Sequence, residues 1–512
     1  MTDTQVLSRP VPPVVAQQAE PPPRRWSLLS TVLLALPPAA LALTLSVLGI
    51  GSRSMWNDEY ATWYASTLSF RDLSKLLVNV DAVVAPYYVV MHYWIVLFGD
   101  SETSLRLPSA LAMAGTAALT ALLGRRLFDT GTGLAAGLIL GGLPSVTRYG
   151  QEARPYAFAI GFAVLATLLL LRAMERPDWR RWLLYAAGLI LAGLVHIVTL
   201  TVLLAHAAFM ARAFRVSGDL RLLRWIAGAS LAVTAALPLA AKGSDQASVI
   251  AWIKADGAAV TGLPERIFGS WQVALVVTAA ALLATVLLGA RHRGSLVLLL
   301  SWAIFPPVFC YVTFPLFHLF LHRYLLFTLP AWALLAAAVG YSLVRFTGRL
   351  SSKVPVSLSA LLVLAAMLLV SGPGQRAARH SPVYGEPDFR GAAAAVLAAA
   401  RPGDGIAYAG STRNGRRAFD YEARDAAMPR DVLVHRTSQA NGTFGAEECA
   451  DPGLCVGDTG RIWLVSTTQS NLSPMDGMPG ATQGFLLTAY TVVPYRTFEN
   501  VRIFALDRKD VK

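Results

Sequence analysis

The chain has 512 residues, of which 55% are hydrophobic and 15% are charged, and its mean hydropathy is +0.50. Soluble domains carry about 25% charged residues, and several apolar runs here approach the roughly 20 residues that cross a bilayer core, which excludes an ordinary soluble protein. The net charge of +13 does not indicate a nucleic-acid partner, because basic residues lie in short loops between the apolar runs, where they set membrane topology. We predict an α-helical polytopic membrane protein.

Residues 1–26 are rich in proline and poor in large apolar side chains, which predicts a disordered cytoplasmic tail. A membrane domain follows over 27–371, and its apolar runs predict about eleven transmembrane helices. The boundary between the fifth and sixth runs, near His196, is not sharply marked in the sequence. The runs lie near 27–50, 105–124, 132–147, 155–174, 182–198, 199–213, 223–241, 271–290, 294–313, 324–344 and 354–371.

A twelfth run near 84–98 is too short to be a secure span, and loop charge decides its placement. When it is left out and the N-terminus is cytoplasmic, the cytoplasmic loops contain the arginine clusters, such as Arg125-Arg126. Counting it would move those clusters outside, against the positive-inside rule. We therefore predict that 84–98 is a juxtamembrane helix. Residues 51–104 then form one long outer loop, with a second short helix near 58–78.

The C-terminal part, 373–512, has the composition of a soluble domain and is predicted to be an extracytoplasmic α/β domain. If it lies outside the cytosol, Cys449 and Cys455 could pair. An Arg/Ala-rich composition indicates a GC-rich genome, and we predict a bacterial plasma membrane. A helix is expected near 388–400, and strands near 405–409, 461–467 and 501–506.

An adjacent acidic pair, Asp58-Glu59, follows the first apolar run and lies in the predicted outer loop. Ionisable residues are costly near hydrocarbon and usually persist where they bind or react. Such a pair, with arginines on the same side, suits transfer between a lipid-linked phosphate and a hydroxyl, because a carboxylate can act as general base and arginines can neutralise phosphate. A second carboxylate with a histidine could hold a divalent cation. The further polar residues on this side include Asp81, Tyr87, Tyr88, His92, Arg106, Gln151, Glu152, Arg154, Arg323 and Tyr324.

Five short motifs together resemble the GT-C superfamily of integral-membrane glycosyltransferases, in the branch of protein O-mannosyltransferases and lipid A aminoarabinose transferases. The resemblance covers roughly 27–371. One departure is Val84-Ala85-Pro86, where many relatives have His-Pro-Pro. The motifs are Trp56-Asn57-Asp58-Glu59, the Pro86-Tyr87-Tyr88 helix, Arg106-Leu107-Pro108-Ser109, Gln151-Glu152-Ala153-Arg154-Pro155-Tyr156 and Arg323-Tyr324.

The resemblance implies an inverting transfer of a sugar, of mannose or arabinose type, from a polyprenyl-phosphate donor to a hydroxyl of a protein, glycan or glycolipid, beside membrane lipid. It implies Asp58 as catalytic base with Glu59 orienting it or binding metal. Glu152, with Asp58 or Glu59, is a candidate ligand for a divalent metal cation. The donor phosphate is assigned to Arg106, Arg323 and Tyr324, and the acceptor or sugar to Asp81, Tyr87, Tyr88, His92, Gln151 and Arg154.

Structural interpretations compete with these roles. Asp58-Glu59 and Asp81 could cap the helices that follow them, Glu152 and Arg154 could be an interface pair, and Arg106 and Arg323 could be headgroup anchors. A transporter or flippase of lipid-linked sugars is the alternative function, although it would place polar groups near the bilayer midplane. A scaffold that only displays the C-terminal domain would leave the outer polar residues unexplained.

Overall fold

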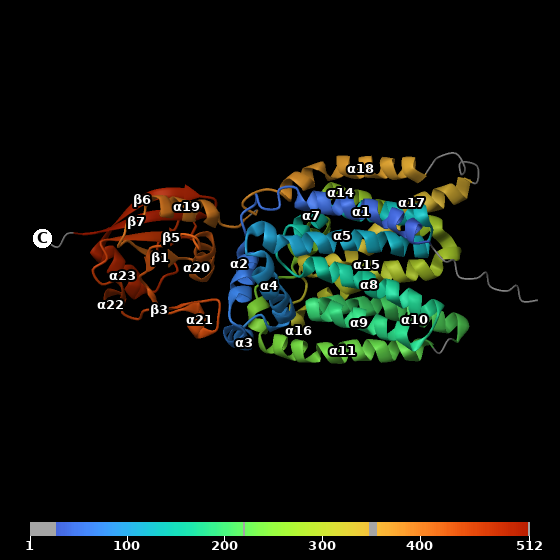
Figure 1. Ribbon diagram of the computed structural model, residues 1–512, viewed down its shortest axis with the longest axis horizontal. Coiled ribbons are helices and arrows are strands. Elements are labelled where there is room, and N and C mark those ends of the chain that lie inside the picture. The colour runs from blue at the N-terminus through green and yellow to red at the C-terminus, as the bar shows by residue number, and fades with distance from the viewer. Residues whose placement is uncertain (1–26, 219–220, 348–355, 384, 470, 510–512) are drawn as a thin grey trace, which may run out of the picture.

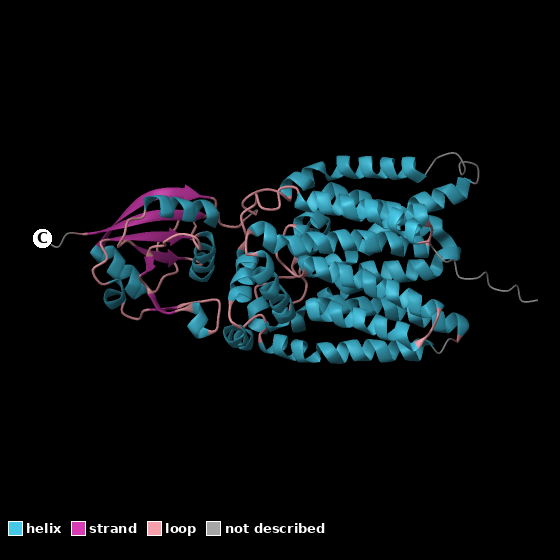
Figure 2. Cartoon of the chain, in the orientation of Figure 1, coloured by secondary structure: helices cyan, strands magenta, loops and turns pink. Residues whose placement is uncertain are grey.

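The computed structural model describes residues 27–218, 221–347, 356–383, 385–469 and 471–509, so the predicted tail at 1–26 lies outside the described residues. Long helices form a bundle, and a smaller α/β domain lies at one end of it, with short helices between them (Figure 1). Among the described residues, strands occur only in the smaller domain (Figure 2). The chain is thus an α-helical polytopic protein with a C-terminal α/β domain, as predicted.

Helices lie at all eleven predicted apolar runs. Within the described residues, seven helices are long and apolar enough to cross a membrane. These are α1 (Leu28–Val47), α5 (Glu102–Leu127), α8 (Tyr156–Glu175), α10 (Val202–Ser217) with the 3-10 turn Ile197–Thr201, α11 (Arg221–Asp245), α14 (Trp271–Leu288) and α15 (Arg293–Val312). The remaining runs hold α6 (Thr130–Gly142), α9 (Trp179–Val195), α17 (Leu329–Thr347) and α18 (Val356–Ala377).

The third predicted run is broken rather than continuous. The helix α6 ends at Gly142 and α7 (Pro144–Gly150) begins at Pro144, with Leu143 between them in an extended conformation. Proline lacks the backbone N–H that a helix interior needs and suits the first turn of a new helix. The short α7 therefore carries the chain to the loop that holds Gln151, Glu152 and Arg154.

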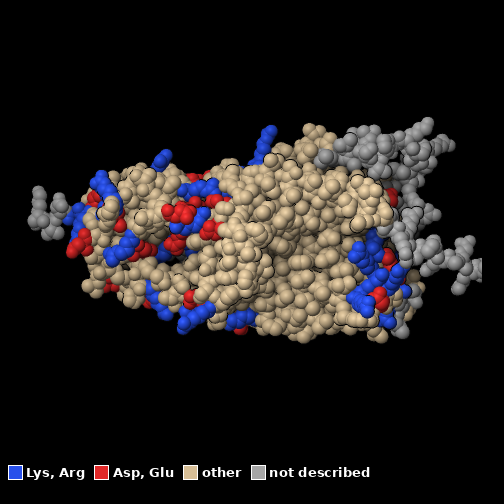
Figure 3. All heavy atoms as spheres, in the orientation of Figure 1, with Lys and Arg blue, Asp and Glu red and all other residues tan. Residues whose placement is uncertain are grey.

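The surface of the bundle has the pattern of a membrane domain. Large apolar side chains point outward from several helices, for example Leu33 at 63%, Leu282 at 58% and Val286 at 78% exposure. Figure 3 shows a broad band without charged atoms between the α/β domain and a group of basic side chains at the far end. At that far end Arg126 pairs with Glu175. This band is what lipid-facing surface requires, because unpaired charges are costly in hydrocarbon.

Close packing between α5 and α6 depends on two glycines. A Cβ on Gly124 would lie 2.8 Å from the Cα of Gly133, and a Cβ on Gly133 would meet the backbone of Ala121. Small residues let membrane helices approach in this way. The same helix α5 carries Arg106 at its other end, so its position bears on the site described below.

Three short helices lie between the bundle and the α/β domain (Figure 1): α2 (Asn57–Thr67), α3 (Phe70–Asn79) and α4 (Ala85–Phe98). The single helix expected near 58–78 is therefore two helices. The division falls at Ser69, whose side chain accepts a hydrogen bond from the N–H of Asp72 and so caps α3. The helix α4 lies with α2 and α3, as predicted for 84–98. Shorter helices in later loops are α12 (Gly257–Thr261), α13 (Leu263–Phe268) and α16 (Phe314–Phe317).

The α/β domain is built on a five-stranded sheet of order β2-β1-β5-β7-β6. The strand β1 pairs in parallel with β2 and β5, whereas β7 pairs antiparallel with β5 and β6. The strands predicted near 405–409, 461–467 and 501–506 are confirmed. The strands are β1 (Gly405–Ala409), β2 (Arg430–Asp431), β5 (Arg461–Ser466), β6 (Tyr490–Phe498) and β7 (Val501–Arg508), with a separate pair, β3 (Val434–Arg436) and β4 (Glu447–Glu448).

Helices of the α/β domain surround this sheet, and the helix predicted near 388–400 is confirmed. Cys449 and Cys455 form the disulfide that was considered from sequence. The helices are α19 (Phe389–Ala399), α20 (Thr412–Glu422), α21 (Ser438–Asn441), α22 (Pro452–Val456) and α23 (Gly480–Ala489).

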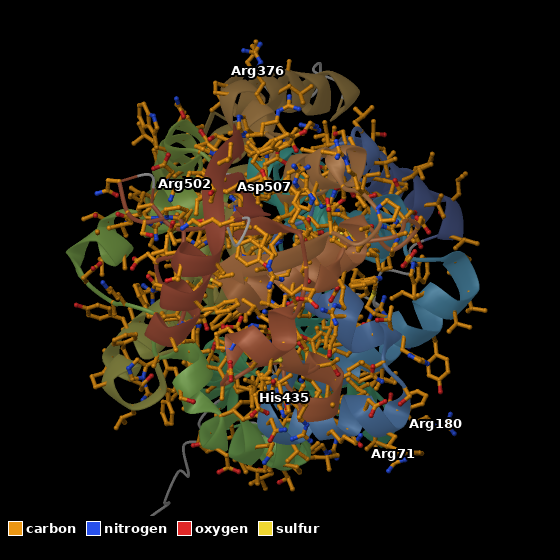
Figure 4. The ribbon with its side chains drawn as sticks, turned by 90° about the vertical axis from the view of Figure 1, so that its left-hand side faces the viewer. Arg71, Arg180, Arg376, His435, Arg502 and Asp507 are labelled. Carbon is orange, nitrogen blue, oxygen red and sulfur yellow. A yellow bond between two sulfur atoms is a disulfide. The ribbon has the colours of Figure 1, made fainter. Side chains whose placement is uncertain are left out.

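The α/β domain is fixed to the short helices by polar and aromatic contacts. The Tyr60 hydroxyl donates to Glu422 at 2.7 Å, and Arg390 donates to Glu102 at 2.8 Å. The ring of Trp63 meets that of Tyr421 edge-on, with centroids 5.1 Å apart. Seen from its own end, the domain covers the middle of the bundle (Figure 4). It therefore stands directly over the polar end of the membrane domain.

Candidate functional site

The first turn of α2 is the centre of the site. The turn follows an extended residue, Trp56, whose N–H donates to the Glu59 carboxylate at 3.4 Å. Such a return contact from the third residue of a helix is half of a capping box, and acidic residues suit this end of a helix. Capping, the structural interpretation raised from sequence, therefore holds for Glu59. Capping does not account for Asp58, because the side chain of Asp58 points in another direction.

Glu59 forms a sealed ion pair with Arg106 of α5. The Arg106 Nε and Nη2 atoms each donate to a different Glu59 oxygen at 2.7 Å, and neither side chain is exposed. The N–H of Ala153 adds a third hydrogen bond at 2.9 Å. Burial opposes ionisation of Glu59, but the Arg106 charge outweighs it and the pKa of Glu59 is lowered. Glu59 is thus a buried, ionised carboxylate that its hydrogen bonds hold in a fixed position.

Arg106 does not fit its predicted role as a donor-phosphate ligand. Besides Glu59, its Nη1 donates to the carbonyls of Ile50 and Arg53 at 2.8 Å, and its Nη2 to that of Ser54 at 3.2 Å. The guanidinium is fully buried and its donors are used within the protein. Arg106 instead ties the end of α1, the loop before α2 and α5 into one unit.

Asp58 is the accessible carboxylate of the turn, with 29% of its side chain exposed. Its Oδ2 lies 3.5 Å from Arg323 Nη2 and 3.9 Å from Arg154 Nη2. Arg154 also donates to the backbone carbonyl of Asp58 at 3.4 Å. The structure therefore brings three predicted residues together from α2, the loop after α7 and the segment before α17. Arg154 orients Asp58, and Arg323 faces it.

Arg323 lies in the short 3-10 helix His322–Tyr324, between α16 and α17. Its guanidinium stacks over two indole rings, 5.2 Å from the Trp56 centroid and 5.6 Å from that of Trp252. Burial disfavours its charge, yet the nearby Tyr156 and Asp58 raise the pKa of Arg323. The ring of the next residue, Tyr324, lies 4.9 Å from that of His196.

A cavity of about 270 Å³ opens beside Arg323. Four of its lining residues are titratable: Lys254, Asp256, Arg266 of α13 and His322. Burial, reinforced by the charge of Arg323, lowers the pKa of His322 to about 3, so its ring is neutral at physiological pH. Sequence reasoning missed Lys254 and Arg266, because an isolated basic residue in a loop is indistinguishable from a topology signal.

Several buried polar atoms around Asp58 have no hydrogen-bond partner among the described residues. Buried polar groups in proteins are nearly always paired, so each such atom needs an explanation. Six of these atoms belong to the start of α2, the loop after α7 and the 3-10 helix His322–Tyr324, and a ligand or water would complete them. They are Trp56 Nε1, Asn57 Oδ1, Glu152 Oε2, Arg154 Nε, His322 Nδ1 and Arg323 Nε.

Glu152, the candidate metal ligand, is bounded by arginines. Its Oε1 accepts from Arg148 Nε at 3.2 Å and lies 3.9 Å from Arg53 Nη2. Gln151 is not directed to Asp58; its amide donates to the Leu48 carbonyl at 2.8 Å. Burial raises the pKa of Glu152. Across the described ranges, no group of three or more His, Cys, Asp or Glu side chains could hold a metal ion, so these residues fit a cation poorly.

The residues of 81–92 divide into two groups. The Tyr88 hydroxyl donates to Asp81 at 2.7 Å. Burial disfavours the charge of the nearby Arg154, but Asp58, Tyr88 and Asp81 outweigh this effect and raise the pKa of Arg154. Asp81 makes no side-chain cap, contrary to that alternative. Tyr87 is buried and its ring faces Phe158.

His92 is not close to Asp58. Its Nδ1 lies 2.8 Å from the Ser66 carbonyl, at the other end of α2, about 12 Å along the helix at 1.5 Å per residue.

The α/β domain adds a carboxyl that sequence reasoning missed. Asn57 Nδ2 donates to Glu386 Oε2 at 2.6 Å. Burial, together with the charge of Asp58, raises the pKa of Glu386 to about 7. No local pattern signals this residue, because it reaches α2 only through the docking of the α/β domain, 329 residues along the chain.

The fold matches solved membrane glycosyltransferases along nearly its whole length. ArnT from Cupriavidus metallidurans in the apo state has a TM-score of 0.58 at 16% identity, covering 93% of this chain and 97% of that one. The same protein bound to undecaprenyl phosphate gives 0.58 at 15%, covering 93% and 98%. The archaeal oligosaccharyltransferase AglB from Archaeoglobus fulgidus, in complex with an inhibitory peptide and a dolichol-phosphate, gives 0.52 at 11%, covering 94% and 74%. No curated protein sequence matches this chain.

The chain therefore has the fold of the GT-C superfamily of integral-membrane glycosyltransferases. Within that class, residues 73–241 match the family model of dolichyl-phosphate-mannose-protein mannosyltransferases. The matched segment runs from α3 to α11 and includes Arg106, Glu152 and Arg154. It ends before Arg323 and excludes Asp58.

Proposed function

We propose that the protein transfers a sugar from a polyprenyl-phosphate carrier to a hydroxyl at the membrane surface. The observation that carries this proposal is the set of buried, unpartnered polar atoms around Asp58, at the end of a membrane bundle with a glycosyltransferase fold. These groups lie at one end of the bundle, where a lipid headgroup meets water. A mannose or arabinose type of sugar is proposed from the family resemblance.

Arg323 is the proposed ligand of the donor phosphate. Its Nε is free to donate among the described contacts, and the adjacent His322 lines the cavity with Lys254 and Arg266. Guanidinium groups bind phosphate oxygens with directed hydrogen bonds. Structural relatives are named as bound to undecaprenyl phosphate and dolichol-phosphate, which supports a polyprenyl carrier here. The carrier's chain would follow the apolar surface of the bundle.

Asp58 is the proposed general base. The acceptor oxygen attacks the anomeric carbon, its proton passes to the Asp58 carboxylate, and the bond from that carbon to the phosphate oxygen breaks. The electron pair leaves on the phosphate, where Arg323 stabilises the added charge. Attack opposite the leaving group inverts the anomeric carbon. Glu59, paired with Arg106, serves to hold the turn that presents Asp58.

A divalent cation, suggested by the acidic residues, remains a separate prediction. If Glu152 and Asp58 bound one, it would supply additional charge neutralisation for the phosphate. The guanidinium groups around each carboxylate already provide positive charge. We therefore expect transfer to survive chelation by EDTA, and loss of transfer that added Mg²⁺ or Mn²⁺ restores would show the opposite.

The proposed orientation places the arginine-rich end of the bundle in the cytoplasm of a bacterial cell and the α/β domain outside its plasma membrane. The disulfide between Cys449 and Cys455 supports this side for the domain, because disulfides persist in oxidising compartments. Arg180, in the first turn of α9, is a suitable tagging position on the other side.

Transfer from radiolabelled undecaprenyl-phosphate mannose and undecaprenyl-phosphate arabinose, in membranes that contain the protein, tests the proposal. We expect Asp58→Asn to lower the rate by about 10²- to 10⁴-fold, the usual contribution of a general base. Asp72→Asn is the matched control, because Asp72 lies in the same segment but on α3, where it bonds Lys75. Equal rates for wild type and Asp58→Asn would remove Asp58 as the base.

A further inference from the structure

The unpartnered atoms around Asp58 fall into two chemical kinds. Trp56 Nε1, Arg154 Nε and Arg323 Nε are hydrogen-bond donors that lack an acceptor among the described residues. Asn57 Oδ1 is an acceptor that lacks a donor within the same ranges. Phosphate oxygens can complete the donors, but an ionised phosphate cannot complete an acceptor. A group that donates, from a second ligand or from water, would complete Asn57 Oδ1.

Asn57 is held so that its acceptor oxygen stays free for that group. Its Nδ2 donates to Glu386 Oε2 at 2.6 Å, which fixes the amide plane. Asn57 immediately precedes Asp58 in the first turn of α2. A hydroxyl that donates to Asn57 would thus lie within one turn of the proposed base, which suits an acceptor molecule with more than one hydroxyl.

Glu386 is held in place on both sides along the chain. Before it, Ser381 Oγ accepts from the N–H of Ser54 at 3.0 Å, and the Ala378 carbonyl accepts from Arg53 at 3.1 Å. After it, Arg390 donates to the Ser52 carbonyl at 3.0 Å. The segment that precedes α2 therefore contacts Ala378, Ser381 and Arg390, on either side of Glu386 along the chain. Glu386 is a fixed part of the wall that the α/β domain adds to the site.

The charges that face Glu386 favour a hydrogen-bonding rather than an ion-pairing role. Asp58 and Glu152 are acidic neighbours, and Arg323 is the basic one. Burial and the Asp58 charge raise the pKa of Glu386 to about 7, so its carboxyl is largely protonated below that pH. A neutral carboxyl both donates and accepts, as hydroxyl recognition requires.

We propose that Glu386 and Asn57 form the acceptor side of the site and hold a hydroxyl-bearing acceptor so that its reacting hydroxyl meets Asp58. The α/β domain thus supplies a specificity-determining residue rather than only covering the membrane domain. The ligand is a polyol, the sugar of a glycan or glycolipid. This inference rests on the proposed glycosyl transfer and names its second substrate site.

Steady-state transfer from the active undecaprenyl-phosphate sugar to the endogenous acceptors of the membranes tests the inference, together with direct binding of undecaprenyl phosphate. We expect Glu386→Ala to lower the transfer rate about 10- to 100-fold, as loss of a hydrogen-bonding group in a reacting complex does. The donor KM and undecaprenyl phosphate affinity should stay at the wild-type values. Glu386→Gln, which keeps a donor and an acceptor, should recover most of the rate.

Transfer by Glu386→Ala at the wild-type rate would overturn the inference, and so would weaker undecaprenyl phosphate binding by Glu386→Ala, which would make the residue part of the donor side. If Glu386→Ala does not elute as a single species in detergent, Asn57→Ala tests the same contact from α2. Failure of the proposed function has a different signature: the wild-type protein would then neither transfer sugar nor bind undecaprenyl phosphate.

Discussion

The first turn of α2 separates two regions built from the same residue types. Beneath it, Glu59 and Arg106 pair with no exposure and leave no donor for a ligand. Above it, Asp58 meets Arg323 and Arg154 at 3.5 and 3.9 Å and stays 29% exposed. We call the first the floor and the second the mouth. A carboxylate beside an arginine is structural in one and available for chemistry in the other.

Helix geometry accounts for this separation. Successive residues of an α-helix project about 100° apart, since a turn takes about 3.6 residues. When Glu59 points into the bundle, Asp58 projects about 100° around the helix from it, toward Arg323 and Arg154. A buried charge is tolerated only when it is paired and hydrogen-bonded, which the floor achieves with Arg106 and the N–H of Ala153. The floor therefore sets where the mouth can be.

Breaking the floor should have the largest effect on stability. Arg106→Ala leaves Glu59 as an unpaired buried carboxylate, and removal of one partner from a buried pair costs about 3–5 kcal/mol. We expect the variant to unfold at a clearly lower temperature in detergent or to fail to accumulate. Thermal unfolding followed by size-exclusion chromatography measures this. Arg323→Ala, at the mouth, is the matched comparison and should lose less stability, because Asp58 keeps its exposure and its contact with Arg154.

If Arg106→Ala kept wild-type stability but lost undecaprenyl phosphate binding, the assignment of floor and mouth would be reversed, and the role predicted for Arg106 from sequence would stand.

Opening the mouth should mainly affect ligand binding. Arg323→Ala removes the donor that faces Asp58, and hydrogen bonds to charged groups contribute about 1.5–3 kcal/mol. We expect undecaprenyl phosphate affinity to fall about 10- to 100-fold, measured by titration in detergent. Arg71→Ala, an exposed arginine of α3 labelled in Figure 4, provides the control. Unchanged affinity in Arg323→Ala would move the phosphate elsewhere in the cavity.

The contrast between floor and mouth also shows what could be predicted from sequence. The apolar runs, the arginine-rich loops and the acidic pair Asp58-Glu59 were enough to predict the helices and to place Asp58, Arg154 and Arg323 on one side. Each of these features can be read from a short stretch of sequence or from the number of membrane spans that precede it. The break at Pro144 was missed because the apolar character continues across it.

The roles of individual side chains could not be predicted in the same way. Arg106 and Arg323 are both arginines near a predicted interface, and only packing reveals that one is saturated and the other is not. Glu386 could not be found, because its position beside Asn57 depends on how the α/β domain docks. Burial and tertiary hydrogen bonds decide function here, and a single sequence reports neither.

Glu386 extends the comparison to a third carboxyl, and its effect on stability should be the smallest. Unlike Glu59, it has no guanidinium bound to it among the described contacts, and burial followed by the Asp58 charge raises its pKa from 4.5 to about 7. Below pH 4.5 the carboxyl is protonated in both the folded and unfolded states. Between pH 4.5 and 7 only the unfolded state ionises, so the folded state loses stability as pH rises, and above pH 7 the loss is constant.

Glu386→Gln removes this dependence, so its stability relative to wild type should increase from pH 4.5 to 7 and then level off. We expect a difference of about 1 kcal/mol, less than the full pKa shift implies because the half-buried carboxyl is partly screened by solvent. Unfolding temperatures of both proteins at a series of pH values measure it. Asp420, whose pKa burial and Asp431 raise to about 6, is present in both proteins and cancels. If the stability difference between the two proteins did not change with pH in this range, Glu386 would ionise like an ordinary surface carboxylate. Burial would then affect the ionisation of Glu59 but not that of Glu386.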